Sequence, residues 1–227
     1  MRIIVEANIP YIRGLLEKFG DVAYLPASGI TADAVQRADA LFVRTRTRCD
    51  ASLLDGSSVK FIATATIGTD HIDLQWCRGA GIDVANAPGC NAPAVAQYVH
   101  AVIGSRFGGD VRGLTLGVVG VGHVGGIVAR WGERLGMRVL RCDPPRQRRE
   151  GGDFVDLATV AREADVITFH TPLTRSGADA TWHIADSRFL ESLSHCRLLV
   201  NSARGGIVDE PAERWRWQST AGRTSRA

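Results

Sequence analysis

Three glycines in the middle of the chain have the spacing of a phosphate-binding turn. Gly120, Gly122 and Gly125 occupy the glycine positions of the pattern G-x-G-x-x-G. The first glycine of this pattern permits a tight turn, the second lets the backbone approach a pyrophosphate, and the third lets a helix pack closely on a strand. The pyrophosphate then lies at the positive end of the helix dipole. The spacing therefore predicts a dinucleotide site.

The flanking residues strengthen this prediction, since glycine is frequent in the chain and chance matches are easily found. An apolar run with Val118 and Val119 precedes the glycines, and a second apolar run ends at Asp143, about 20 residues beyond the last glycine. An acid at this distance binds the ribose 2′-hydroxyl of NAD and repels the extra phosphate of NADP. The polar segment 144–152, which we predict to be a loop, offers arginines as an alternative partner for a 2′-phosphate. The acid favours NAD.

Composition indicates an ordinary soluble protein. The 227 residues are 45% hydrophobic and 22% charged, and the net charge of +3 is not gathered on one groove-reading element. We therefore expect no nucleic-acid partner. Five dispersed cysteines without a C-x-x-C pair suggest neither a disulfide framework nor a metal site. No apolar stretch is long enough for a signal peptide or a membrane span, so a cytoplasmic protein without a membrane partner is expected.

The elements that must position the site follow from the apolar runs. In the first part of the chain, strands are expected at 2–5, 22–25, 40–43, 60–65 and 82–85, and helices at 11–19, 31–38, 51–54 and 71–80. Thr31 is a candidate N-cap. Strands that alternate with helices predict an α/β fold with mostly parallel sheets covered on both faces.

The alternation continues after a long helix expected at 92–107, where Val95, Val99 and Val102 recur at helical spacing. Beyond the glycine turn, helices are expected at 156–164 and 186–193, and strands at 166–169 and 197–200. Each of these two strands runs into a polar turn. Ligands bind beyond the carboxyl ends of strands in open α/β sheets, which is where these turns lie.

Several short strings together resemble the D-2-hydroxyacid dehydrogenases. They are VRTRT at 43–47, TATIGTDHID at 64–73, APGCNAPAVAQYV at 87–99, GVVGVGHVG at 117–125, CDPPR at 142–146, TFHTPLT at 168–174 and NSARGGIVD at 201–209. The resemblance implies two Rossmann-like domains. These are a flavodoxin-like substrate domain at 1–91 and an NAD-binding Rossmann domain at 110–209, joined by an interdomain helix at 92–109. It further implies that the substrate is a small phosphorylated 2-hydroxy acid.

The resemblance assigns roles to individual residues. Arg204 matches the arginine that clamps the substrate carboxylate and polarises the developing carbonyl, a task that suits a planar guanidinium; the alternative is a surface arginine. Thr45 and Thr66 match substrate contacts that reach a phosphorylated substrate in the interdomain cleft. Arg44 and Arg46 suit a phosphate, although alternating arginines are also ordinary at an exposed strand end.

Cofactor contacts near the nicotinamide ribose are implied for Thr171, Ser202, Ala203 and Arg204. The hydroxyl of Thr171 has the alternative role of satisfying the backbone at a strand end. None of the six histidines corresponds to the catalytic histidine, which the family carries much later, so none is assigned as the general base. The full-length family implies a homodimer.

The chain departs from the family after Arg204. The family continues with a further strand, a glutamate and the catalytic histidine, whereas this sequence runs VDEPAERWRWQSTAGRTSRA and stops. We therefore expect a truncated second domain, a disordered tail at 210–227 and impaired activity. Three functions stay open: oxidation of a phosphorylated 2-hydroxy acid with NAD, oxidation of another D-2-hydroxy acid such as phosphoglycerate, and a non-catalytic NAD-binding module.

Overall fold

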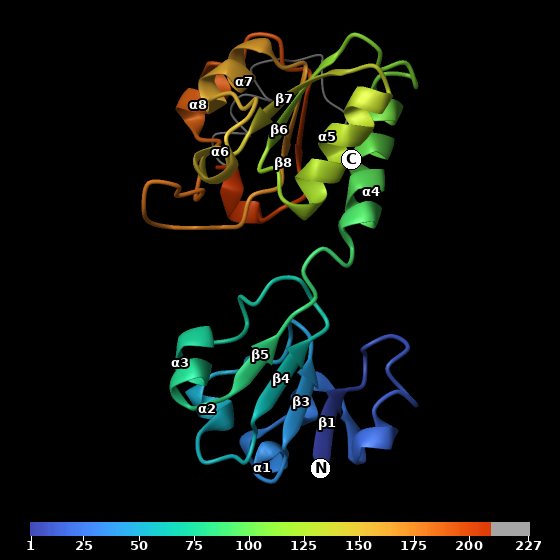
Figure 1. Ribbon diagram of the computed structural model, residues 1–227, viewed down its shortest axis with the longest axis vertical. Helices are drawn as coiled ribbons and strands as arrows, with labels where there is room; N and C mark the ends of the chain where they lie inside the picture. Colours follow the sequence, from blue (N-terminus) through green and yellow to red (C-terminus); the bar gives the residue numbers. More distant parts are fainter. Residues whose placement is uncertain (210–227) are drawn as a thin grey trace. The chain divides into compact units, whose positions relative to one another are not determined.

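The computed structural model describes residues 1–209, which fall into two compact α/β units (Figure 1). The N-terminal unit is Met1–Cys90 and the C-terminal unit is Asn91–Ala227. Each unit contains one parallel sheet with helices on it, so the predicted fold class is confirmed. The tail expected at 210–227 lies outside the described residues. None of the described helices is both long enough and apolar enough to cross a membrane.

The N-terminal sheet has the strand order β2-β1-β3-β4-β5, and every neighbouring pair is parallel. The strands are β1 (Arg2–Glu6), β2 (Asp21–Leu25), β3 (Ala40–Val43), β4 (Phe61–Thr64) and β5 (Asp83–Ala85). From β1 the chain adds β2 on one side, and it then adds β3, β4 and β5 on the other side. The loops that leave the carboxyl ends of strands β1 and β3 therefore run in opposite directions. In open α/β sheets this switch point is where ligands bind.

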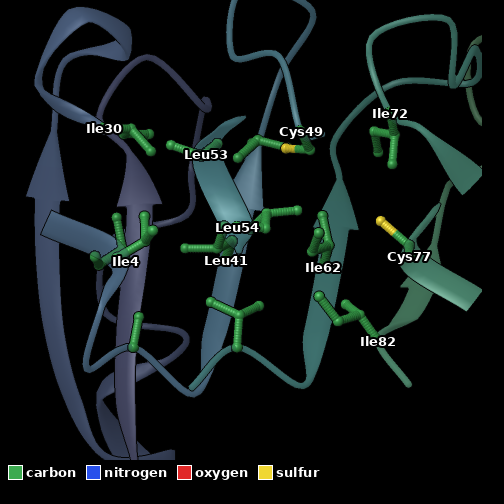
Figure 2. Close-up of a cluster of buried hydrophobic side chains, with 14 residues drawn as sticks. Ile4, Ile30, Leu41, Cys49, Leu53, Leu54, Ile62, Ile72, Cys77 and Ile82 are labelled. Atoms are coloured by element: carbon green, nitrogen blue, oxygen red, sulfur yellow. The ribbon is translucent and has the colours of Figure 1, made fainter. Parts of the chain in front are cut away.

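Both faces of this sheet are covered, which explains why most residues of its inner strands β1, β3 and β4 are apolar. Ile4, Leu41 and Ile62 project from neighbouring strands into one core, where Leu53 and Leu54 pack against them (Figure 2). The alternate residues of the strands, such as Ile3, point to the other face and lie in a second core. The period of two along each strand thus divides the apolar residues between two cores.

Short helices connect these strands, and acceptor side chains begin several of them. They are α1 (Ala32–Val35), α2 (Ala51–Leu54) and α3 (Leu74–Gly79), with 3₁₀ turns η1 (Glu17–Phe19) and η2 (Ala27–Gly29). The hydroxyl of Thr31 accepts from the N–H of Ala34 at 3.4 Å, which confirms the predicted N-cap. Asp50 and Asp73 cap α2 and α3 in the same way.

The prediction of a helix at 11–19 is wrong. The segment forms turns and ends in η1. Tyr11 has a φ of 59° and Gly14 a φ of 83°, both in the left-handed region that a right-handed helix does not use. The Glu17 carboxylate accepts the N–H of Gly14 at 3.1 Å and the hydroxyl of Tyr24 at 2.7 Å. Such local side-chain bonds compete with helix formation.

The C-terminal sheet has the order β7-β6-β8-β9 and is also parallel throughout. Its strands are β6 (Thr115–Val119), β7 (Arg138–Cys142), β8 (Val166–Phe169) and β9 (Leu198–Asn201). On one face α4 (Ala92–Arg106) and α5 (His123–Arg134) lie side by side (Figure 1), and they pack on Leu116 and Val118. On the other face α7 (Leu157–Glu163) and α8 (Ser187–Glu191) cover Ile167 and Phe169.

The loop predicted at 144–152 is also wrong, because Pro144–Glu150 forms the helix α6. Asp143 caps this helix by accepting the N–H of Arg146 at 2.9 Å, and proline occupies the first turn, where its missing N–H costs nothing. Arg146 and Glu150 form an i,i+4 ion pair at 2.7 Å. The helix buries no residue, so it has no apolar stripe for a sequence pattern to detect.

Candidate functional site

The glycine turn has the shape that its sequence requires. Gly120 follows β6 with a φ of +85°, and a Cβ there would lie 2.8 Å from the nitrogen of Thr171. A Cβ on Gly125 would lie 1.9 Å from the carbonyl oxygen of Gly120. Gly122 is exposed, and a Cβ there would meet nothing within 4 Å. The outer glycines thus serve a tight turn and close packing, while the middle one borders open space.

Two polar features of the turn fit a dinucleotide. Gly122 is the N-cap of α5, and no side chain among residues 1–209 caps this helix end, so its first N–H groups and the helix dipole are available to a phosphate. The Thr171 hydroxyl oxygen is buried and has no hydrogen-bond partner in the part of the chain that the structure describes. Its methyl carbon lies 2.9 Å from the Cβ that Gly120 lacks. A buried hydroxyl with its hydrogen-bonding capacity unused, beside a glycine turn, fits contact with a polar ligand.

Asp143 stands at the end of β7, and its carboxylate is bonded to the glycine turn. One carboxylate oxygen accepts the N–H of Val121 at 2.8 Å, and the other accepts the N–H of Arg146. The Arg146 guanidinium donates to the carbonyl of Val121 at 2.5 Å. Asp143 therefore fixes the turn as well as α6. Each carboxylate oxygen has a second lone pair, so a contact with a ribose hydroxyl stays a prediction.

A neutral histidine connects the ends of β8 and β9. His170 Nε2 lies 2.9 Å from the Thr168 hydroxyl, and Nδ1 lies 3.1 Å from the Ser202 hydroxyl. Burial, with a smaller effect of nearby His100, lowers the pKa of His170 to about 4. At neutral pH the ring therefore donates at one nitrogen and accepts at the other. This residue was missed as a site residue, although Thr168 and His170 share one side of the strand by their spacing.

The turn after β9 is closed by Asn201. Its side chain accepts the N–H of Ala203 at 3.1 Å and donates to the carbonyl of Arg204 at 2.8 Å. Arg204 is exposed, and its guanidinium bonds to the carbonyl of Ala203 at 3.1 Å. The structure thus gathers the glycine turn, Thr171, Ser202, Ala203 and Arg204 at the carboxyl edge of one sheet.

Thr45 and Thr66 share the carboxyl edge of the N-terminal sheet. Val43 and Thr64 are register partners in β3 and β4, and each threonine follows two residues later. Thr45 is exposed in the turn after β3, whereas Thr66 is half-buried. The structure brings the two predicted substrate contacts to one sheet edge.

A chain of hydrogen bonds orients Thr66. Its hydroxyl donates to the carbonyl of Gly68 at 3.0 Å and lies 2.7 Å from the Thr64 hydroxyl, which lies 3.1 Å from His71 Nε2. Burial lowers the pKa of His71, so its ring is neutral near pH 7. The Thr66 hydroxyl has one proton, which is used in the bond to Gly68, so the Thr64 hydroxyl is the donor in its bond to Thr66. The proton of Thr64 is then used as well, so His71 is the donor in its bond to Thr64. Thr66 therefore offers a ligand only an acceptor.

Known proteins of one family are similar to this chain over both of its units. The model of the family described as D-isomer specific 2-hydroxyacid dehydrogenase, NAD binding domain, matches residues 91–212. An erythronate-4-phosphate dehydrogenase of Bacteroides fragilis is 47% identical over 93% of this chain and 62% of its own length. One of Azotobacter vinelandii is 47% identical over 99% of this chain and 59% of its own. The chain spans about three fifths of the length of these relatives.

Solved structures have the same fold. The NAD⁺-bound 3-phosphoglycerate dehydrogenase of Entamoeba histolytica matches with a TM-score of 0.79 and 26% identity, over 96% of this chain and 77% of that one. The D-lactate dehydrogenase of Aquifex aeolicus, complexed with NAD and lactic acid, matches with a TM-score of 0.77 and 25% identity, over 96% and 74%.

Proposed function

The chain belongs to the D-isomer specific 2-hydroxyacid dehydrogenase family, and from that membership we propose that it oxidises 4-phospho-D-erythronate at carbon 2 with NAD. The product is the corresponding 2-oxo acid, and the reaction belongs to pyridoxal phosphate biosynthesis. The observation that carries the proposal is the identity with erythronate-4-phosphate dehydrogenases, which extends over both units.

The C-terminal unit supplies the cofactor side of the reaction. The helix end at Gly122 holds the pyrophosphate, and Asp143 binds the adenosine ribose. Thr171, Ser202 and Ala203 contact the cofactor near the nicotinamide ribose. Bound NAD would supply the acceptor for the hydride that leaves carbon 2 of the acid. The proton of the carbon 2 hydroxyl would pass to solvent water, since no histidine of the sequence is assigned as the general base.

The acid itself needs a cation for its carboxylate and hydrogen bonds for its polar groups. Arg204 clamps the carboxylate and stabilises the charge that develops on the carbonyl oxygen, since its guanidinium donates two parallel hydrogen bonds. Thr45 and Thr66 contact the phosphorylated acid, and Thr66 does so as an acceptor. Arg44 and Arg46 flank Thr45 and offset the charge of the phosphate. The predicted homodimer stays a prediction.

Steady-state kinetics of the purified chain tests the proposal. We expect NAD reduction with 4-phospho-D-erythronate that is slow, because no general base is assigned, at a kcat/KM that is still well above that with D-3-phosphoglycerate. A higher kcat/KM with phosphoglycerate would place the chain in another branch of the family. NADH binding by calorimetry without turnover of either acid would replace oxidation by a non-catalytic NAD-binding role.

A further inference from the structure

A buried carboxylate lies at the switch point of the N-terminal sheet. Glu6 is the last residue of β1 and is 1% exposed. Its neighbour strand β3 runs into the turn that carries Thr45. Glu6 thus stands below the place where the loops after β1 and β3 diverge, which is the usual ligand site of this topology.

One oxygen of Glu6 holds both ends of that turn. Oε2 accepts the N–H of Arg44 at 2.8 Å and the hydroxyl of Thr47 at 3.0 Å, and Thr47 is itself only 3% exposed. The N–H of Thr47 donates to the carbonyl of Arg44 at 3.3 Å. The two residues that flank the Thr45–Arg46 pair are therefore tied to one buried atom.

The Arg44 side chain connects the same turn to the loop after β1. Its guanidinium donates to the carbonyl of Asn8 at 3.2 Å. The N–H of Ile9 in turn donates to the carbonyl of Glu6 at 3.1 Å. Both loops at the switch point are thus fastened to Glu6 or to its immediate neighbours.

The fold alone does not require a carboxylate at this position. A buried charge pays a large desolvation cost, and apolar residues of similar volume often stabilise a fold as well or better. Every other residue of β1 that is buried, from Ile3 to Val5, is apolar. What Glu6 adds is an acceptor with a fixed direction for two donors of the turn.

We propose that Glu6 is a positioning residue that fixes the turn 44–47 and so sets Thr45 for contact with the phosphorylated acid. The inference rests on the proposed function, because the role of Thr45 belongs to it. It adds a residue that touches no substrate and acts through Arg44 and Thr47. Glutamine can accept from the same two donors, so the geometry and not the charge is what the turn requires.

The test uses the full chain and three variants. Glu6→Ala removes the acceptor, Glu6→Gln keeps it, and Asp39→Asn is the matched control. Asp39 accepts the N–H of Arg2 at 2.6 Å, at the opposite end of the same sheet. Calorimetry gives the Kd for 4-phospho-D-erythronate, fluorescence titration gives the Kd for NADH, and hydrogen exchange gives the protection of the Arg44 amide.

We expect Glu6→Ala to weaken binding of the acid by roughly ten- to a hundredfold, because small displacements of positioning groups have effects of this size. Protection of the Arg44 amide falls with it, and NADH affinity stays unchanged. Glu6→Gln restores most of the affinity for the acid. Asp39→Asn leaves both affinities unchanged. If Glu6→Ala does not fold, Thr47→Val removes one of the two donors and gives a smaller loss in the same direction.

The outcomes separate this inference from the function on which it rests. Wild type that binds no 4-phospho-D-erythronate overturns the proposed function and this inference with it. Wild type that binds the acid while Glu6→Ala, or Thr47→Val in its place, binds it equally well overturns the positioning role alone. Loss of affinity in Glu6→Gln as large as in Glu6→Ala also overturns it, since the geometry is then not what matters.

Discussion

The hydroxyl of Ser202 lies 3.1 Å from Nδ1 of His170, so the turn after β9 is bonded to the end of β8 through a half-buried neutral ring. The other ring nitrogen is engaged by Thr168. Both hydroxyls can rotate to accept from a protonated ring, so what opposes a second proton is the cost of placing a charge in a desolvated position. The ring thus holds Ser202, one of the predicted cofactor contacts, against the end of β8.

His170 makes stability depend on pH. Its folded pKa of about 4 is below the ordinary value of 6.5, so between these values the unfolded chain binds more protons than the folded one. Stability contributed by the neutral ring is present above pH 6.5 and is lost as the pH falls toward 4. We expect the free energy of unfolding to fall by up to about 3 kcal/mol across this window because of this group. Urea unfolding at several pH values should show a smaller fall in His170→Gln; equal falls would contradict the assignment.

Two glycine substitutions should affect different properties: one mainly lowers stability and the other mainly lowers NADH affinity. Gly125→Ala places a Cβ against the Gly120 carbonyl and should cost about 1–3 kcal/mol of stability. Gly122→Ala meets no atom within 4 Å and should cost at most about 1 kcal/mol, as expected at an N-cap. Yet its methyl group occupies the space that a pyrophosphate needs, so NADH affinity should fall. Thermal unfolding and fluorescence titration check both; unchanged NADH binding by Gly122→Ala would argue against this pyrophosphate position.

Asp143→Ala should lose both stability and cofactor affinity. It removes the cap of α6, which costs about 1 kcal/mol, and frees the glycine turn at Val121. Asp156→Ala is the matched control, because Asp156 caps α7 by accepting from the N–H of Thr159 at 2.6 Å. Asp156→Ala should lose the stability of one cap and Asp143→Ala somewhat more in urea unfolding, since it also frees Val121, and only Asp143→Ala should bind NADH more weakly. Equal NADH affinities would leave Asp143 with a structural role alone.

Arg204→Lys should lower kcat/KM for the acid by roughly a hundredfold, the usual effect of removing a donor to developing charge. NADH affinity should change little, because the cofactor contact implied for Arg204 is made by its backbone. Arg197→Lys is the control, because Arg197 precedes β9 at its other end and stacks on Phe107 at 4.5 Å. If the two variants are equally active, Arg204 does not clamp the carboxylate.

The sequence predicted most of the strands because their apolar runs are buried on both faces. The glycine turn was also predicted with the correct flanking elements, since its residues are close in sequence. The contacts that hold the predicted site residues were missed. Glu6 bonds Arg44 from 38 positions away, and His170 bonds Ser202 from 32 away, so only the fold brings them together. A charged residue at the end of the run RIIVE was the one available signal for Glu6.

At two places, local capping and turn residues determine a structure that the hydrophobic pattern did not predict. Segment 11–19 has helical spacing, but the backbone at Tyr11 and Gly14 is left-handed. Segment 144–152 has no apolar stripe, yet capping by Asp143 and the pair Arg146–Glu150 make it helical. Capping and turn residues act over three or four positions, where hydrophobic patterns carry little information.

Transfer of the hydride itself tests the central claim most directly. The chain is incubated with NAD and 4-phospho-D-erythronate deuterated at carbon 2, and the reduced cofactor is examined by mass spectrometry. We expect NADH that carries the deuterium, formed in step with the 2-oxo acid. Formation of unlabelled NADH, or of no NADH while the cofactor binds, would contradict it.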